Sequence, residues 1–307
     1  MLDGVLFFPV TPFAPDGSVD LKALADHVRS GLEAGPGGIF VACGTGEFHA
    51  LHPREYAEVV RTAVEVADGR VPVFAGAGGA LPLAQECART AQQAGADGLL
   101  LMPPYLVQGP PAGLVDYTRQ VSEASELPVI VYHRATACFD VASAVEVARL
   151  PRVVGFKDGY GDLDLLSRIV TAVRRAMAAD GKEFQFFNGM PTAEGTVPAY
   201  RGIGVELYSS AVFCFAPEIS LAFHRAVTEG DDAVVERLLA EFFHPLIALR
   251  HKAPGYAVSL VKAAVRQRGL DVGGVRAPLV DPTPEHLAEL ARITEAGLAV
   301  CAEVAAR

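Results

Sequence analysis

Positive charge and cysteine are scarce in this sequence. Its 26 lysines and arginines stand against 36 aspartates and glutamates, a formal net charge of −10, which argues against nucleic acid and acidic membrane surfaces as partners. The five cysteines are scattered and form no C-x-x-C pair, so we expect a reduced cytoplasmic protein. The sequence has no apolar run long enough to span a bilayer and no signal-peptide pattern. An anionic substrate would therefore need positive charge supplied locally by its own site.

Apolar residues, in contrast, are abundant and regularly ordered. Hydrophobic residues make up 51% of the chain and charged residues only 20%, which is enough for a large core. Eight short runs rich in Val, Ile, Leu and Phe alternate with segments of helical periodicity. The predicted strands are residues 4–10, 37–43, 71–77, 98–102, 128–132, 153–157, 184–188 and 204–208.

This alternation predicts an α/β fold, a (β/α)8 TIM barrel, because apolar strands that alternate with helices form parallel sheets covered on both sides. A doubly wound open sheet is the alternative, but the first strand is followed by "PVTPF" and not by a glycine-rich dinucleotide turn. We expect residues 1–229 to form the barrel that carries the active site, and residues 230–307 to form a C-terminal helical extension packed on it. The helical pattern near the C-terminus covers residues 211–229, 231–250, 254–268 and 284–304.

Lys157 is the first candidate for chemistry, because it ends a predicted strand, where TIM barrels place their active sites. Alternation along the strands points Lys157 and Tyr132 inward from neighbouring strands. A lysine in a dry site has a lowered pKa, so its neutral amine can attack a ketone and form a Schiff base, while a nearby phenol can move protons. In the alternative interpretation, Lys157 pairs with Asp158 or Asp162 and only caps a helix.

Two glycine-rich turns follow predicted strands. "CGTGEF" offers backbone N–H groups and the Thr45 hydroxyl, which suit a carboxylate or phosphate, although an ordinary tight turn is the alternative. Neither this turn nor "GAGGAL" at 76–81 matches G-x-G-x-x-G, because His49 and Leu81 stand at the third glycine position. The sequence therefore gives no indication of a nucleotide site.

Other polar clusters have simpler interpretations. His49 and His52 lack a third ligand of matching placement, which favours solvated or packing histidines over a metal site. The run Arg250-His251-Lys252 is interpreted as surface charge or as a subunit contact.

Together the motifs resemble the dihydrodipicolinate synthase and N-acetylneuraminate lyase superfamily of Schiff-base barrels, across nearly the full length. The signs are the G-T-G-E turn, the tyrosine that ends strand five and the G-F-K lysine that ends strand six. Within this superfamily, the chain most resembles the branch of 5-dehydro-4-deoxyglucarate dehydratases. The stretches that carry this resemblance are "FFPVTPF", "GFKDGYGD", "NGMPTAEGTVPAYRGIGVELYSSAVF" and "APGYAVSLVKAAVR".

The resemblance implies roles for individual residues. Lys157 would be the Schiff-base lysine and Tyr132 the proton-transfer phenol. The implied substrate-binding residues are Gly44, Thr45 and Gly189 at the carboxylate beside the ketone, Ser209 and Ser210 at the polar chain, Arg134 at the distal carboxylate, and Asn188.

The chain departs from the superfamily at several of these positions. Gly44-Thr45 replaces the usual pair of threonines, and Leu106 falls where synthases lend a tyrosine from a neighbouring subunit; the dehydratase branch shares both changes. His133 and Thr136 stand where the branch usually has asparagine, and we expect them to face the far end of the substrate.

The resemblance implies a lyase that dehydrates and decarboxylates 5-dehydro-4-deoxyglucarate, a small keto sugar acid, to 2,5-dioxopentanoate. It implies no cofactor and no metal, because the lysine supplies the electron sink, and it implies a homo-tetramer or homo-dimer. One alternative is an aldolase that releases pyruvate from a 2-keto-3-deoxy sugar acid. Another is a non-catalytic sugar-acid sensor, since fold does not fix function.

Overall fold

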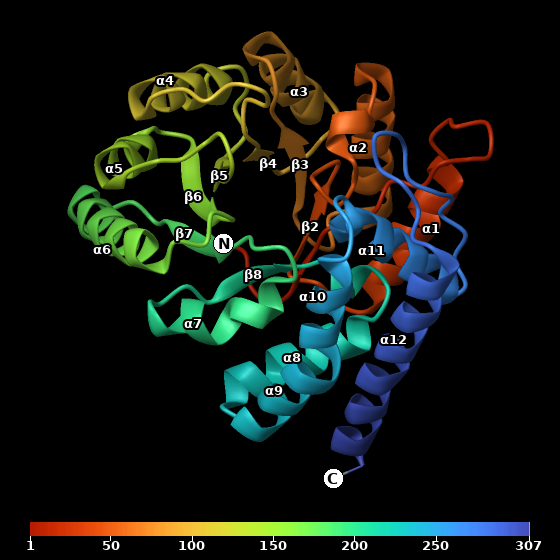
Figure 1. Ribbon diagram of the computed structural model, residues 1–307. Helices are drawn as coiled ribbons and strands as arrows, with labels where there is room; N and C mark the ends of the chain where they lie inside the picture. Colours follow the sequence, from red (N-terminus) through yellow and green to blue (C-terminus); the bar gives the residue numbers. More distant parts are fainter. Residues whose placement is uncertain (307) are drawn as a thin grey trace.

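Eight parallel strands close into a barrel in the computed structural model, which describes residues 1–306 (Figure 1). Each strand pairs with the next along the chain, and the last pairs with the first. The (β/α)8 TIM barrel is thus confirmed, and the doubly wound alternative is wrong. The strands are β1 (Leu6–Phe7), β2 (Gly38–Val41), β3 (Val73–Ala77), β4 (Gly98–Leu101), β5 (Val129–His133), β6 (Val153–Asp158), β7 (Gln185–Asn188) and β8 (Leu207–Ser210).

The two strands that close the barrel differ most from their predicted bounds. β1 is much shorter than residues 4–10, in part because Pro9 has no N–H to donate to a neighbouring strand. β8 begins three residues late, because Gly204 has a φ of +82° and belongs to the preceding turn.

Eight helices follow the strands and surround the barrel (Figure 1). Each of the first five packs against the next, so these helices cover the outer face of the apolar strands. Aspartate side chains cap the first turns of three of these helices, namely α1, α5 and α6. The helices are α1 (Leu21–Glu33), α2 (Pro53–Ala67), α3 (Leu81–Gln93), α4 (Pro111–Ser122), α5 (Val141–Arg149), α6 (Leu163–Asp180), α7 (Val197–Gly202) and α8 (Pro217–Glu229).

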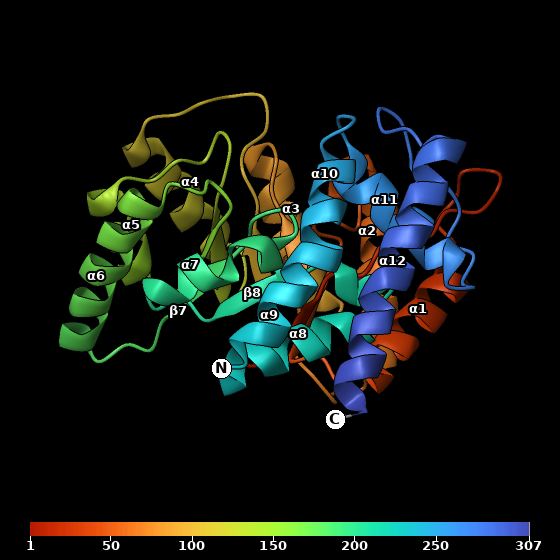
Figure 2. The same ribbon diagram turned by 60° about the horizontal axis from the view of Figure 1, so that its bottom comes forward.

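The C-terminal extension is helical, as predicted, and lies along one side of the barrel (Figure 2). It comprises α9 (Asp232–Leu238), α10 (His244–Arg250), α11 (Tyr256–Gln267) and α12 (Pro284–Ala305). α12 packs on α8, α9, α10 and α11. The division of the chain between residues 229 and 230 stays a prediction.

The predicted helix 231–250 is interrupted by one π-helical turn, Leu239–Phe243. Pro245 stands in the first turn of α10 and lacks the N–H that would bond to the Glu241 carbonyl. A wider turn at this point lets the helical path continue without that hydrogen bond.

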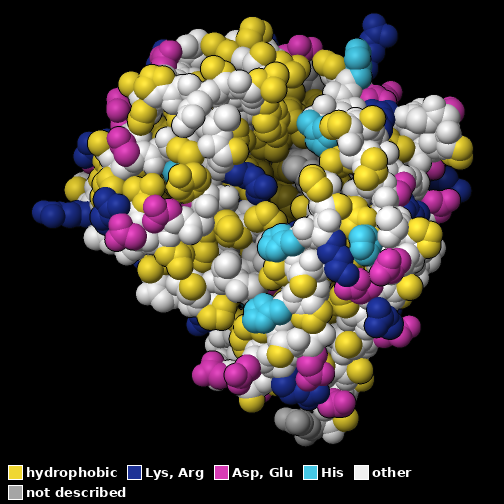
Figure 3. Space-filling view, in the orientation of Figure 1, with side chains coloured by type: hydrophobic (Ala, Val, Ile, Leu, Met, Phe, Trp, Pro, Cys, Tyr) yellow, Lys and Arg dark blue, Asp and Glu magenta, His cyan; other side chains and the backbone are white. Residues whose placement is uncertain are grey.

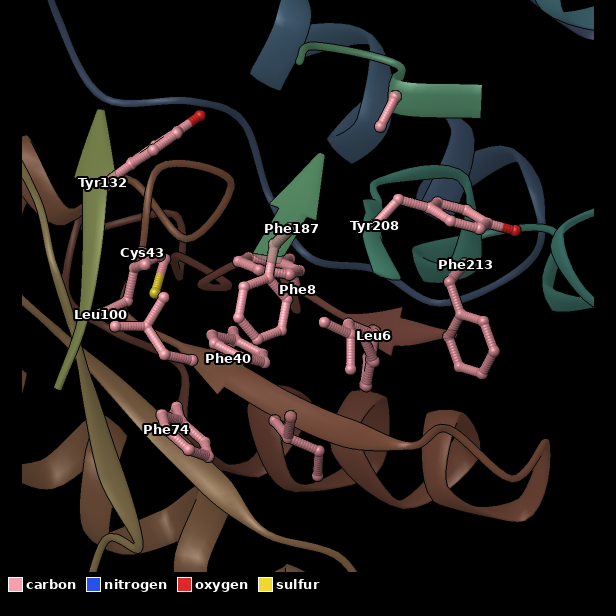
Figure 4. Packing of buried hydrophobic residues seen from close by; sticks show 14 of the residues in the cluster. Leu6, Phe8, Phe40, Cys43, Phe74, Leu100, Tyr132, Phe187, Tyr208 and Phe213 are labelled. Atoms are coloured by element: carbon pink, nitrogen blue, oxygen red, sulfur yellow. The ribbon is translucent and has the colours of Figure 1, made fainter. Parts of the chain in front are cut away.

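Stacked phenylalanine rings fill the barrel beneath the carboxyl ends of the strands (Figure 4). The rings of Phe8 and Phe40 lie 4.6 Å apart with 12° between their planes, and those of Phe40 and Phe74 lie 5.0 Å apart at 16°. All three side chains are buried. This packed floor keeps the barrel interior dry below any site at its rim.

Within residues 1–306, no helix has the length and apolar character needed to cross a membrane.

Candidate active site

A cavity of about 330 Å³ opens at the carboxyl ends of the strands. Figure 3 looks into this hollow, which has largely apolar walls and basic side chains at its edge. The loops after the strands form one wall, and α10 and α11 of the extension contribute the other. Seven residues predicted from the sequence line it: Gly44, Thr45, Tyr132, Arg134, Lys157, Gly189 and Ser209.

Lys157 lies at the end of β6 with only 5% of its surface exposed. Its Nζ is 4.1 Å from the ring centroid of Phe8 and 4.6 Å from that of Tyr132. Burial, reinforced by the charge of Arg134 and opposed by Cys43, lowers the pKa of Lys157 to about 7. A large fraction of the amine is therefore neutral near pH 7.

The interpretation of Lys157 as the partner of a nearby aspartate is wrong. Among the described residues, it forms no ion pair within 4.0 Å. Asp158 instead accepts hydrogen bonds from the Tyr200 hydroxyl and, at 3.1 Å, from the Gly161 N–H. Asp162 caps α6 through the N–H of Leu165.

Tyr132 lies directly beside Lys157, because the two residues are register partners on β5 and β6. Its hydroxyl donates a 2.6 Å hydrogen bond to the Gly189 carbonyl and accepts one of 2.9 Å from Arg134 Nη1. Burial raises the pKa of Tyr132, with Arg134 opposing the rise. The phenol is thus protonated and held over the cavity by two hydrogen bonds.

Two glycines make room for this pair of side chains. A Cβ on Gly189 would lie 2.6 Å from Lys157 Cε, and a Cβ on Gly159 would lie 2.7 Å from Tyr132 Cε2. Any larger residue at either position would displace the lysine or the phenol.

The turn after β2 is held firmly at the cavity wall. Glu47 adopts a left-handed φ of 53°, and Thr11 Oγ1 donates a 2.7 Å hydrogen bond to the Gly46 carbonyl. Open space surrounds the position where a Cβ would stand on Gly44. The backbone of Gly44 and Thr45 is therefore accessible to an anion in the cavity.

Two residues predicted to bind substrate do not line the cavity. Asn188 donates through Nδ2 to the Ala193 carbonyl and to Thr196 Oγ1, at 3.1 and 2.9 Å. Ser210 is fully buried and donates to Glu194. These side chains form hydrogen bonds to the residues that organise the loops behind the site, so the structure does not bring them to the cavity.

The expectation that His133 and Thr136 face the substrate is also wrong, since neither lines the cavity. His133 is buried; its Nδ1 accepts a hydrogen bond from the Phe139 N–H, and burial lowers its pKa to about 4. His52 is likewise structural, because its Nδ1 accepts from the Arg54 N–H and caps α2. His49 lines the cavity.

Arg250 is the residue that the sequence interpretation missed. The sequence predicts surface charge or a subunit contact at this position, but Arg250 is only partly exposed and lines the cavity. It reaches the site from the end of α10, far from the barrel motifs in the sequence. A helix-terminal arginine carries no local pattern that distinguishes it from a solvent-exposed one.

The sequence matches the dihydrodipicolinate synthetase family over residues 1–297. The chain belongs to this family. Its fold agrees, since dihydrodipicolinate synthase from Bacillus clausii superposes with a TM-score of 0.87 at 28% identity, covering 96% of this chain and 97% of that one. A prophage protein of the dihydrodipicolinic acid synthase family from E. coli K12, whose structure was solved with pyruvate, superposes with a TM-score of 0.84 at 25% identity. The match covers 96% of this chain and 98% of that one.

Closer relatives in sequence carry one name. The chain is 59% identical over 304 residues to the probable 5-dehydro-4-deoxyglucarate dehydratase 1 of Streptomyces coelicolor, covering 99% of this chain and 96% of that protein. It is 39% identical to the probable 5-dehydro-4-deoxyglucarate dehydratase of Bacillus licheniformis, covering 97% and 94%. The resemblance noted in the sequence is therefore confirmed.

Proposed function

We propose that the chain is a Schiff-base dehydratase that converts 5-dehydro-4-deoxyglucarate to 2,5-dioxopentanoate, water and CO2. The observation that carries this proposal is Lys157: a buried amine with a pKa of about 7, unpaired by any carboxylate of residues 1–306 and adjacent to a phenol. The shared name of relatives up to 59% identical supports the choice of substrate.

The first step is formation of the iminium. The neutral Nζ of Lys157 attacks the substrate ketone, and water leaves as the carbon–nitrogen double bond forms. Tyr132 is positioned to pass protons to and from the departing oxygen. The carboxylate beside the ketone binds the backbone of Gly44 and Thr45.

The iminium then drives two eliminations. A base removes a proton from the carbon next to the iminium, and the resulting enamine expels the β-hydroxyl as water. The distal carboxylate leaves as CO2, and its bonding electrons move through the conjugated system to the nitrogen. Protonation and hydrolysis release 2,5-dioxopentanoate and free Lys157, so each turnover gives one net water and one CO2.

A product assay on purified protein tests this proposal. With 5-dehydro-4-deoxyglucarate we expect CO2 and 2,5-dioxopentanoate in equal amounts, and Lys157→Ala should abolish both while the protein keeps its fold. Pyruvate without CO2 would instead identify an aldolase. Binding without turnover would identify a sensor, and substantial activity in Lys157→Ala would contradict the Schiff-base mechanism.

We infer further that the enzyme acts in the cytoplasm as a homo-oligomer, a tetramer or dimer. Exposed apolar residues in the loop after β4 support a contact with a second copy: Tyr105, Leu106 and Val107 are 43%, 103% and 59% exposed. Light scattering on Leu106→Lys tests this, because a charge buried in such a contact should shift the protein towards the monomer. An unchanged mass would place the contact elsewhere.

A further inference from the structure

The charge lining the cavity is one-sided. Lys157, Arg134 and Arg250 line it, and none of the lining residues is an aspartate or glutamate. This stands out in a chain of net charge −10. A site lined by two guanidiniums and a lysine, with no acid among its lining residues, favours a ligand with more than one negative charge.

Arg250 is held in place by the loop after β7. Its Nη1 donates to the Pro191 carbonyl at 2.5 Å and to Thr192 Oγ1 at 2.8 Å, and its Nη2 contacts His251 Nε2 at 2.8 Å. Within residues 1–306, no acceptor is bound by Nε. Nε–H and the second Nη2–H can therefore still form the two parallel bonds that a carboxylate accepts.

Arg250 and Arg134 line the same cavity. Burial, and then the positive charge of Arg134, lower the pKa of Arg250. Neither guanidinium has a carboxylate within ion-pair distance in the described part of the chain. Two uncompensated cations repel each other, and an anion bound between them would relieve that repulsion.

We propose that Arg250 of the C-terminal extension acts with Arg134 as a clamp for the distal carboxylate of a six-carbon 2-oxo dicarboxylate. The turn of Gly44 and Thr45 holds the other carboxylate, next to the ketone, and Lys157 lies at the ketone itself. This inference rests on the proposed function and deepens it. Arg250, from helix α10 outside the barrel, then determines the specificity for dicarboxylates, while Lys157 and the barrel supply the chemistry that any 2-oxo acid could undergo.

Borohydride trapping with two acids tests the clamp. Pyruvate has only the carboxylate beside the ketone, whereas 2-oxoadipate has the six-carbon skeleton of the proposed substrate without its hydroxyls. For Arg250→Gln we expect the half-saturating concentration of 2-oxoadipate to rise about 10- to 100-fold, the range of a lost charge-assisted contact, with that of pyruvate unchanged. Arg237→Gln is the matched control, because Arg237 pairs with Glu241 and Glu303 away from the cavity.

Equal weakening of both acids in Arg250→Gln would overturn the clamp, because it would mean that Arg250 only holds the loop of Pro191 and Thr192. No change with either acid would overturn it as well.

Thermal shift in a Lys157→Ala background separates the clamp from the lysine chemistry. This background forms no imine, yet 2-oxoadipate should still stabilise it more than pyruvate does, and adding Arg250→Gln should remove the difference. If the wild type traps neither acid but this Arg250-dependent shift is present, the proposed function fails and the clamp stands. If the shift does not depend on Arg250, the clamp fails whatever the trapping shows.

Discussion

Glu47 Oε1 and Lys262 Nζ lie 2.9 Å apart, with both side chains wholly buried, although the residues are 215 positions apart in the sequence. Glu47 belongs to the turn after β2 and Lys262 to α11 of the extension. The backbone N–H of Arg276 donates to the second carboxylate oxygen of Glu47, and Lys262 Nζ also donates to the Gly274 carbonyl. The extension thus fixes the turn that we propose holds the substrate carboxylate.

Breaking this pair from one side should destabilise the protein strongly. Lys262→Met leaves the Glu47 carboxylate buried without its cation, which costs about 3–5 kcal/mol of unfolding free energy. Urea denaturation measures the loss, and Glu47→Gln combined with Lys262→Met should recover part of it. Lys252→Met is the control, because Lys252 pairs with Glu289 at the surface, where such pairs contribute about 1 kcal/mol or less. If Lys262→Met and Lys252→Met lost the same unfolding free energy, burial would not make the Glu47–Lys262 pair special.

The fold could be predicted because its signals are local. Apolar strands and amphipathic helices alternate in the sequence itself, so each of the eight predicted strands and each of the predicted C-terminal helical segments overlaps an element of the structure. The errors lie at turns and prolines. Gly204 delays β8 through its positive φ, and Pro245 interrupts a predicted helix by removing one N–H.

The candidate site was only partly predictable, for a different reason. Lys157 and Tyr132 were placed together by strand alternation, which is a local rule that the register of β5 and β6 obeys. Arg250 and the Glu47–Lys262 pair depend on how the extension packs on the barrel, which no local pattern encodes. Ser209 and Ser210 are adjacent in sequence, but the strand points them to opposite faces.

Formation of the lysine adduct should depend on pH near neutrality. Burial lowers the pKa of Lys157 to about 7, and only the neutral amine is a nucleophile. The initial rate of borohydride-trapped adduct with pyruvate should therefore rise between about pH 6 and 8 and then level off. Because the charge of Arg134 contributes to the lowering, Arg134→Gln should move the inflection to higher pH. A rise confined to pH above 9 would indicate a lysine of ordinary basicity.

The two adjacent serines should have separable effects. Ser209 lines the cavity, so Ser209→Ala should change kcat or KM with little effect on unfolding. Ser210 Oγ donates a hydrogen bond to Glu194, shares one of 2.9 Å with Ser220 Oγ, and accepts one of 3.2 Å from the backbone N–H of Phe213. Ser210→Ala should therefore cost about 1–3 kcal/mol of stability and leave KM unchanged. Steady-state kinetics and urea denaturation of both variants measure these effects. If Ser209→Ala and Ser210→Ala changed the kinetic constants and the unfolding free energy alike, the two serines would not have separate roles.

Glu194 should make the protein less stable as pH rises from acid to neutral. It is fully buried, one oxygen accepts from Ser210, and the other has no hydrogen-bond partner within residues 1–306. Burial raises its pKa from 4.5 to about 7, so the folded state binds the proton more tightly than the unfolded chain does. The stabilisation from protonation is fully present below about pH 4.5, is lost as pH rises through 7, and does not change further above it.

Glu194→Gln keeps the shape of the side chain but removes the titration. The difference in unfolding free energy between wild type and Glu194→Gln should change by up to about 3 kcal/mol between pH 4.5 and 7.5, in favour of the variant at the higher pH. Denaturant titrations at four or five pH values measure this directly. Glu206→Gln, on the exposed turn before β8, is the matched control and should follow the wild-type curve. Parallel curves for wild type and Glu194→Gln would show that Glu194 titrates alike in the folded and unfolded chain, and would require its second oxygen to be hydrated.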